Sequence, residues 1–255
     1  MTITSLSGLG IVALFLLLML LFAFTGQKKS RLPLRPIPAF KRLWRTIGLA
    51  VEDGTRLHLS VGRGAVNAPE SASAFVGLRM VQRIMRTVSI SDRHPIVTSG
   101  DGALNILSRD TLQASYKAMG QAGQYRPSAG RLTGPTPFSF ASGVMSVIAD
   151  EEVSANVLIG HFGPEVALIL EAGDRKNNLT LAGSDHLPGQ AVLYAAAQEP
   201  LIGEEVYAGG AYLQAGNAHT ASLQAQDVLR WLVILVILGG AVLHFLGLGN
   251  LIPIG

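Results

Sequence analysis

The chain has 255 residues, enough for one sizeable domain or two small ones. Hydrophobic residues make up 49% of it and charged residues only 15%, against about a quarter in an ordinary globular domain, so part of the chain is expected to lie in lipid. Its net charge of +3 comes from the first 45 residues, because Lys plus Arg number 13 and acidic residues 17 from Thr46 onward. A mildly acidic body without a basic stripe argues against nucleic-acid binding. The absence of Cys excludes disulfides, thiolate metal sites and a cysteine nucleophile.

The first segment is predicted to be a transmembrane helix over residues 1–26. Ile3 to Gly26 contains no charged residue, and about 20 apolar residues span the roughly 30 Å core of a bilayer as a helix. Its positive charges follow the apolar run, which is the reverse of the order in a cleaved secretory signal, the alternative interpretation. The N-terminus is therefore expected outside and the residues after the helix inside.

Residues 27–45 are predicted to be a basic juxtamembrane linker. Pro33, Pro36 and Pro38 favour an extended and stiff chain. Phe40 to Ile47 either forms a short amphipathic turn on anionic lipid or belongs to a simple basic collar. The positive side chains expected at the membrane surface are Lys28, Lys29, Arg31, Arg35, Lys41, Arg42 and Arg45.

A β-hairpin is predicted over Ile47–Val61. Ile47, Leu49 and Val51 alternate before Asp53-Gly54, and Leu57, Leu59 and Val61 alternate after it. Asp-Gly suits the positive φ angles of a type I′ turn between two strands.

The next elements alternate between helices and strands. Apolar residues at helical spacing predict helices over Ser71–Val88 and Leu104–Met119, and short apolar runs predict strands over 94–98, 144–148, 153–159 and 179–182. Residues 121–137 are predicted to be a long loop, and helices are expected after Pro164 and over 189–198. This alternation predicts one α/β domain over 46–219 with a mainly parallel sheet, edged by the N-terminal hairpin.

A second transmembrane helix is predicted over residues 220–249, with a polar N-terminal extension and a tail at 250–255. Leu232 to Leu248 is apolar apart from His244, whose role stays open, and a packed core helix is the alternative. Arg230 and Trp231 mark a membrane interface. Both basic flanks adjoin the central domain, so the sequence predicts an inner-membrane protein with a cytoplasmic domain and both termini outside.

Glycine-rich junctions between strands and helices are the candidate cofactor-binding residues. Glycines at helix N-termini can expose amides to a phosphate, but glycine in a tight turn needs no ligand. The Gly62-Arg-Gly64 segment lacks the third glycine of the dinucleotide fingerprint, and no Gly-Lys-Ser/Thr occurs, so no cofactor is predicted. The glycines concerned are Gly62, Gly64, Gly100, Gly102, Gly160 and Gly163.

Asp101, His161, Asp185 and His186 are the candidate catalytic residues. In a parallel sheet they follow strand ends and would share one edge, where carboxylates and imidazoles can run acid–base chemistry or bind a metal. None has the local spacing of a metal motif, so no metal is predicted. The alternative makes Asp185 a turn or cap residue and the histidines ordinary loop residues.

Three stretches carry a resemblance: Val97–Gly102, Gly203–Leu213 and Ala221–Trp231. Together the chain resembles an uncharacterised family of prokaryotic two-span membrane proteins known only as a domain of unknown function. The resemblance implies a span at each end and no activity, cofactor or site residue.

The sequence favours a membrane-anchored interaction or scaffold protein over an enzyme. It is expected to assemble with itself or with a membrane complex, and the small residues Ala208–Ala211 would allow close packing between neighbours. The alternative is a membrane-tethered nucleotide- or metal-binding enzyme or sensor that uses the glycine junctions. The expected partners are the lipid bilayer and protein, without nucleic acid.

Overall fold

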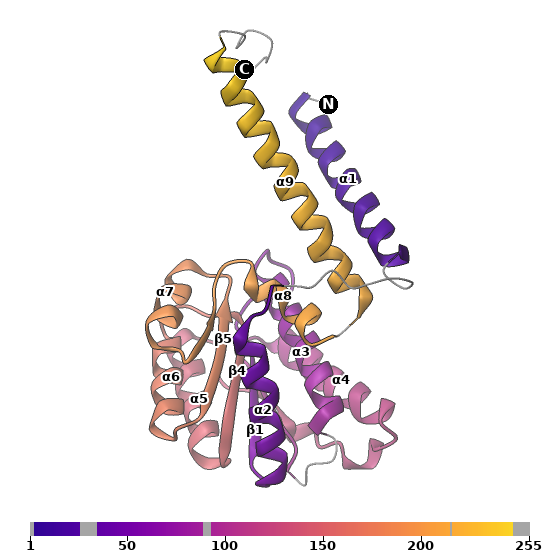
Figure 1. The fold of residues 1–255 in the computed structure, drawn as a ribbon. Coiled ribbons are helices and arrows are strands. Elements are labelled where there is room, and N and C mark those ends of the chain that lie inside the picture. The colour runs from indigo at the N-terminus through magenta and orange to yellow at the C-terminus, as the bar shows by residue number, and fades with distance from the viewer. Residues whose placement is uncertain (1–2, 26–34, 89–92, 215, 247–255) are drawn as a thin grey trace. The chain divides into compact units, whose positions relative to one another are not determined.

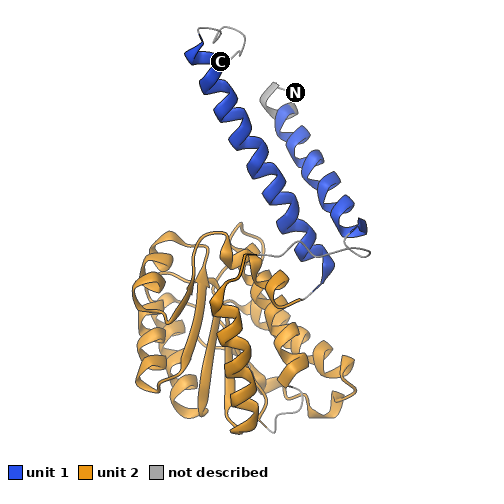
Figure 2. Ribbon diagram, in the orientation of Figure 1, with its two compact units in different colours: residues 1–34, 216–255 blue, residues 35–215 orange. Residues whose placement is uncertain are grey.

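A computed structural model describes residues 3–25, 35–88, 93–214 and 216–246 of the chain. The chain divides into two compact units, one of residues 1–34 with 216–255 and one of residues 35–215 (Figure 2). Lys28, Lys29 and Arg31, three of the residues predicted at the membrane surface, lie outside the described residues.

Unit 2, residues 35–215, is built on a six-stranded sheet whose neighbouring strands are all parallel (Figure 1). The spatial order is β3-β2-β1-β4-β5-β6. A mixed α/β domain with a parallel sheet is therefore confirmed. The strands are β1 Arg56–Gly62, β2 Ile96–Ser99, β3 Gly130–Leu132, β4 Val153–His161, β5 Leu179–Ser184 and β6 Glu199–Leu201.

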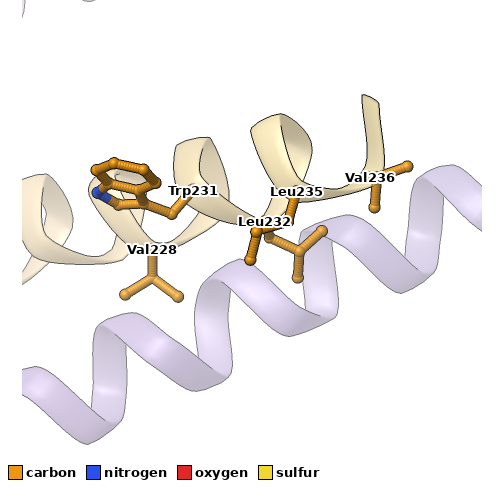
Figure 3. Close-up of a pocket in the computed structure, with 5 residues that line it drawn as sticks. All are labelled: Val228, Trp231, Leu232, Leu235 and Val236. Atoms are coloured by element: carbon orange, nitrogen blue, oxygen red, sulfur yellow. The ribbon is translucent and has the colours of Figure 1, made fainter. Parts of the chain in front are cut away.

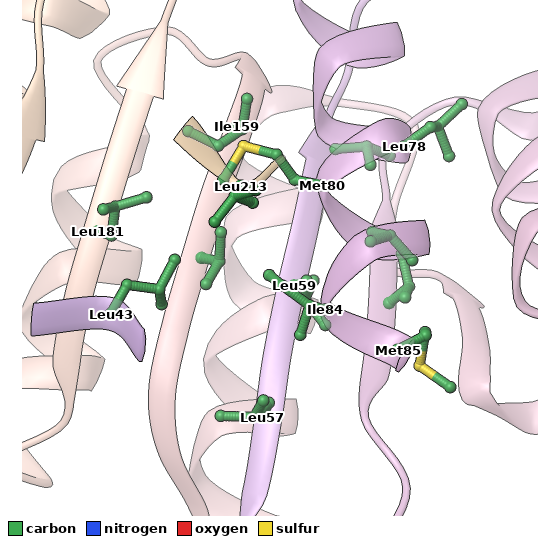
Figure 4. Close-up of a cluster of buried hydrophobic side chains, with 14 of the residues drawn as sticks. Leu43, Leu57, Leu59, Leu78, Met80, Ile84, Met85, Ile159, Leu181 and Leu213 are labelled. Carbon is green, nitrogen blue, oxygen red and sulfur yellow. The ribbon is translucent and has the colours of Figure 1, made fainter. Parts of the chain in front are cut away.

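Helices cover both faces of this sheet, as a parallel sheet with two buried faces requires. One hydrophobic cluster joins the sheet to α2, α3, α4 and α8, and includes Leu43, Leu213 and Ile84, of which Ile84 lies beside Leu59 (Figure 4). A second cluster joins the other face to α5, α6 and α7. The helices are α2 Pro38–Glu52, α3 Ser71–Val88, α4 Gly102–Ala118, α5 Pro137–Asp150, α6 Val166–Arg175, α7 Leu187–Ala196 and α8 Glu205–Tyr212.

The predicted hairpin over Ile47–Val61 is wrong in its first strand, because these residues belong to α2. Phe40, Leu43, Ile47 and Ala50 are buried at spacings of three and four residues, which is the period of a helix. Asp53-Gly54 ends this helix: the Asp53 N–H donates to the Leu49 carbonyl, and Gly54 takes a φ of +65°. Since Phe40, Leu43 and Ile47 lie in the core, the alternative of an amphipathic turn on lipid is also wrong for these side chains.

The strand predicted over Val144–Ile148 is also wrong, because it lies within α5. Phe140, Val144, Val147 and Ile148 share the buried face of that helix, and Thr136 with Ser139 forms its capping box. The loop predicted over 121–137 contains β3 and two 3-10 turns, Ala122–Gln124 and Pro127–Ala129. The short elements β3, β6 and α8 were not predicted.

The remaining elements of unit 2 agree with the predictions. The helix over Ser71–Val88 is confirmed with those bounds. The strands predicted over 94–98, 153–159 and 179–182 correspond to β2, β4 and β5, and the predicted helices correspond to α4, α6 and α7.

The described residues of unit 1 form two long apolar helices, α1 Ile3–Thr25 and α9 Asn217–Phe245. They run side by side in opposite directions, so the first turn of α1 and the last turn of α9 lie at the same end of the pair (Figure 1). Both are long and apolar enough to cross a membrane, Ser7–Thr25 in α1 and Asn217–Phe245 in α9. Two candidate membrane spans are thus present in the described chain.

Candidate functional site

The strand order of unit 2 places a reversal between β1 and β4. It is the order of the doubly wound sheets that bind dinucleotides, in which ligands lie beyond the carboxyl ends of the strands where the order reverses. Such a topology locates a site and does not assign an activity. The carboxyl edge of β1, β4 and β5 is therefore the first place to look for chemistry.

A paired imidazole and carboxylate lie at this edge. His161 ends β4 and Asp185 directly follows β5, and the two strands pair with Gly160 opposite Ser184. The His161 Nδ1 lies 2.8 Å from the Asp185 Oδ1. The other carboxylate oxygen, Oδ2, accepts a hydrogen bond of 2.8 Å from the Ser73 hydroxyl near the start of α3. Asp185 thus joins three elements.

The His161–Asp185 pair is only partly exposed, with side-chain exposures of 21% and 12%. The hydrogen bond to Asp185 raises the pKa of His161 above 6.5, while burial opposes the increase. With Nδ1 directed at the carboxylate, Nε2 is the nitrogen that can exchange a proton with a ligand or water.

His186 and Glu70 complete the polar cluster. The His186 ring lies 5.1 Å from the His161 ring, measured between centroids. The negative charge of Glu70 also raises the pKa of His161. Within the described chain, the buried His186 Nδ1 and Glu70 Oε2 have no hydrogen-bond partner. Burying an unpaired polar atom is costly, so these two atoms are polar groups that the fold's own hydrogen bonds leave unsatisfied.

Asp101 has a different role from the residues of this cluster, because it caps helix α4. Its side chain accepts a hydrogen bond of 2.9 Å from the Leu104 N–H, which makes it the N-cap of that helix. The structure therefore joins His161, Asp185 and His186 and uses Asp101 as a cap.

An ion pair not anticipated from the sequence connects the junctions after β1 and β4. The Arg63 Nε lies 3.1 Å from the Glu165 Oε1, which also accepts a hydrogen bond of 3.1 Å from the Gly163 N–H. The Glu165 side chain is 4% exposed, so these donors take the place of water at its carboxylate. The pair lies where the strand order reverses.

Close packing explains five of the six candidate glycines. A Cβ atom on Gly62, whose φ is +73°, would lie 2.5 Å from the His161 carbonyl oxygen, and one on Gly160 would lie 2.1 Å from that of Val61. Gly102 alone has open space beside it. At the other five the chain's own atoms occupy the space beside the backbone, which favours turn and packing geometry over a phosphate cradle. A Cβ atom added to any of the remaining three would likewise come too close to nearby protein atoms: Gly64, Gly100 and Gly163.

The small residues Ala208–Ala211 are also used inside the unit. All four are buried in α8, and a Cβ atom on Gly209 would lie 2.6 Å from the Met80 Sδ of α3. This band therefore packs two helices of one chain and is not a free surface between chains.

A second polar row, buried in the sheet, was not anticipated either. The His58 Nδ1 lies 3.0 Å from the Asn156 Oδ1, and the His58 Nε2 lies 2.9 Å from the Thr98 Oγ1. The Asn156 Nδ2 donates to the Thr180 Oγ1 at 3.4 Å, so the row crosses β2, β1, β4 and β5. Burial lowers the pKa of His58 to about 4, which keeps the ring neutral and makes this row structural.

The chemistry that the carboxyl edge can support is proton transfer by the His161–Asp185 pair. Three or more His, Asp or Glu side chains grouped to hold a metal ion are not found in the portion that the structure describes.

Comparison with known proteins adds a family. No curated protein and no solved structure matches the chain. Residues 2–252 match the family described as a domain of unknown function, DUF6754. This match covers nearly the whole chain, both apolar helices and the α/β unit included. The chain belongs to the DUF6754 family.

Proposed function

We propose that the protein is a two-span protein of the inner membrane that holds its α/β unit at the cytoplasmic face and serves there as an interaction or scaffold protein. It assembles with copies of itself or with a membrane complex. This proposal rests on the exposed side chains of α1 and α9 and on an apolar groove on α9.

Exposed apolar side chains on α1 and α9 support the proposed membrane location. Leu17 in α1 and Leu235, Val236 and Ile237 in α9 are each more than 60% exposed, although unit 2 has hydrophobic cores of its own. Water disfavours such a surface at about 25 cal/mol per Å², and a bilayer removes that cost.

The basic residues support the orientation. Arg230 precedes the apolar part of α9, and the positive residues after Thr25 follow α1. Because the helices are antiparallel, the end of α1 and the start of α9, which these basic residues adjoin in the sequence, lie at the same end of the pair. Lys and Arg concentrate on the cytoplasmic side of membrane proteins, which supports the proposed orientation with the α/β unit inside and both termini outside.

A groove on α9 supports assembly within the membrane. It is lined by Val228, Trp231, Leu232, Leu235 and Val236 and has a volume of about 520 Å³ (Figure 3). Val228 and Leu232 point toward the neighbouring α1. Helices associate in lipid through close packing, and an apolar groove beside an existing pair gives a further helix a place to pack.

Cross-linking with matched variants tests this assembly. Leu235→Cys lies in the groove, and Ile237→Cys lies two residues away on a different face of α9, at a similar exposure. In native membranes we expect cross-linked products from Leu235→Cys and few from Ile237→Cys. Light scattering should show a detergent-solubilised complex heavier than one chain. A single-chain mass together with equal cross-linking of the two variants overturns the proposal.

The second candidate function is a membrane-tethered enzyme or sensor, and the His161–Asp185 pair is the observation that favours it. A ligand held at the carboxyl edge would raise the melting temperature of the protein, and Asp185→Asn would abolish that increase. Thermal-shift screening with nucleotides and divalent metals measures this. Absence of any shift in the unsubstituted protein overturns the enzyme or sensor candidate.

A further inference from the structure

The carboxyl edge of the sheet carries exposed apolar side chains at each of its six strand-to-helix junctions. Each helix from α3 to α8 begins at this edge, because it follows a strand and runs back along the sheet. Each has one exposed large hydrophobic residue among its first five residues. These residues, named here the carboxyl-edge rim, are Phe75, Ile106, Phe138, Leu168, Leu187 and Tyr207.

The amino edge of the sheet has fewer exposed large hydrophobic residues than the carboxyl edge. Leu187 is 78% exposed and Phe138 is 72% exposed at the rim. In the described part of unit 2, the large hydrophobic residues that are exposed away from the carboxyl edge are Leu49, late in α2, and Tyr194, late in α7. The distribution is therefore one-sided, whereas isolated exposed apolar residues are ordinarily scattered over a surface.

The chain enters and leaves unit 2 beside this edge. Arg35 lies 3.0 Å from Glu205, the first residue of α8, which follows β6 at the carboxyl edge. Phe40 stacks on Tyr212 at 4.9 Å between ring centroids. The two ends of unit 2 are thus held together, and each continues in the sequence toward an apolar helix.

We propose that the carboxyl-edge rim docks onto the surface of the lipid bilayer, with its apolar side chains entering the interfacial layer. The proposal rests on the membrane location proposed above. Two tethers keep unit 2 at a high effective concentration near lipid, so a few apolar side chains are enough to hold it there. Each side chain that enters the interface contributes in proportion to the apolar area it buries.

The charges near the rim indicate whether its docking requires anionic lipid. Glu70, Asp101 and Glu205 lie at the same junctions, and Arg63 is already paired with Glu165. The rim therefore has no excess of positive charge, and its docking should not require anionic lipid. Exposed apolar side chains spread over all six junctions, with Leu132 at the end of β3 as a further one, suit a fluid lipid interface better than the continuous apolar centre of a protein interface.

Site-directed spin labelling of the full chain tests the docking, because the chain contains no Cys. Phe138→Cys and Leu187→Cys report on the rim, and Leu49→Cys and Tyr194→Cys are matched controls at the other edge. Ile237→Cys reports on membrane insertion of α9. The protein is reconstituted in phosphatidylcholine vesicles, and the accessibility of each nitroxide to oxygen and to a water-soluble nickel chelate is measured.

We expect the ratio of oxygen to nickel accessibility to be several-fold higher at positions 138 and 187 than at 49 and 194, and unchanged when anionic lipid is added. Nickel access at 138 and 187, with oxygen access at 237, overturns the docking and leaves the membrane location standing. Nickel access at 237 overturns the membrane location itself. Protection of 138 and 187 from both reagents indicates a protein contact and overturns the lipid proposal.

Discussion

His161 and Asp185 form a pair whose position was predictable and whose contact was not. The carboxyl ends of parallel strands meet at one edge, so the sequence placed both residues there. Their hydrogen bond depends on the register between β4 and β5, and the Arg63–Glu165 pair depends on the approach of the loops after β1 and β4. These are long-range features that no local sequence pattern encodes.

Replacing Asp185 by Asn should lower the stability of the protein in a pH-dependent way. Folding raises the pKa of His161, so the stability that this pair adds is fully present below pH 6.5 and is lost as the pH rises through the native-state pKa. Urea unfolding of the detergent-solubilised chain should show a larger loss for Asp185→Asn at about pH 5.5 than at pH 8. Ser73→Ala removes the other hydrogen bond to Asp185 and should lower the free energy of unfolding by the same amount at both pH values. Equal losses for Asp185→Asn would contradict the pairing.

The contribution of the buried His58 to stability should depend on pH in the opposite direction to that of His161. Its pKa is about 4 in the native state and 6.5 when unfolded, so the unfolded chain binds the proton more readily. Stability should fall by about 3 kcal/mol as the pH decreases through this window. In His58→Gln this component disappears, because the side chain cannot be protonated, although the variant is less stable at neutral pH. Parallel profiles for the two proteins between pH 4 and 6.5 would exclude this role for His58.

At the scale of single elements, helix α2 shows where sequence patterns are ambiguous. Ile47, Leu49 and Val51 alternate as in a strand, while Phe40, Leu43, Ile47 and Ala50 follow the period of a helix, and only the core decides between them. Ser71–Val88 was predicted with its bounds because 18 residues repeat one period clearly. Segments of three residues such as β3 and β6 are too short to show any period, and their pairing with β2 and β5 defines them.

Two glycines of this region test the helix directly. Gly48 lies on the exposed face of α2, so Gly48→Ala should stabilise the protein by about 0.5–1 kcal/mol through better helix propensity. Gly54 has a φ of +65° just after the helix, so Gly54→Ala should destabilise it by about 1–2 kcal/mol. Both sites have no neighbouring atom within 4 Å of the added Cβ, so backbone conformation alone sets the sign. The two unfolding free energies are measured together, and destabilisation by Gly48→Ala would argue against the helix.

At the scale of the whole molecule, the two units differ in what they require from their surroundings. Unit 2 buries hydrophobic clusters on both faces of its sheet, whereas many hydrophobic side chains of α1 and α9 are exposed. The sequence predicted this division because the apolar runs lie at both ends and the α/β alternation lies between them.

A fragment of residues 35–215 should therefore fold without the apolar helices. We expect the circular dichroism of a mixed α/β protein and one cooperative transition in urea, since unit 2 forms a separate set of contacts. The full chain, by contrast, should remain in the membrane fraction after alkaline extraction. A fragment that lacks a cooperative transition would show that unit 2 depends on the rest of the chain.

The central pairing of β1 with β4 has a consequence for synthesis on the ribosome. Arg56 lies beside Val153, so one side of β1 stays without its neighbour until almost 100 further residues have been made. During that interval β1, β2 and β3 can form only half of the sheet, with an apolar edge open to pairing with another nascent chain. The first apolar helix is complete long before, at Thr25. Early capture of that helix by the membrane would keep nascent chains apart while the half-sheet awaits β4.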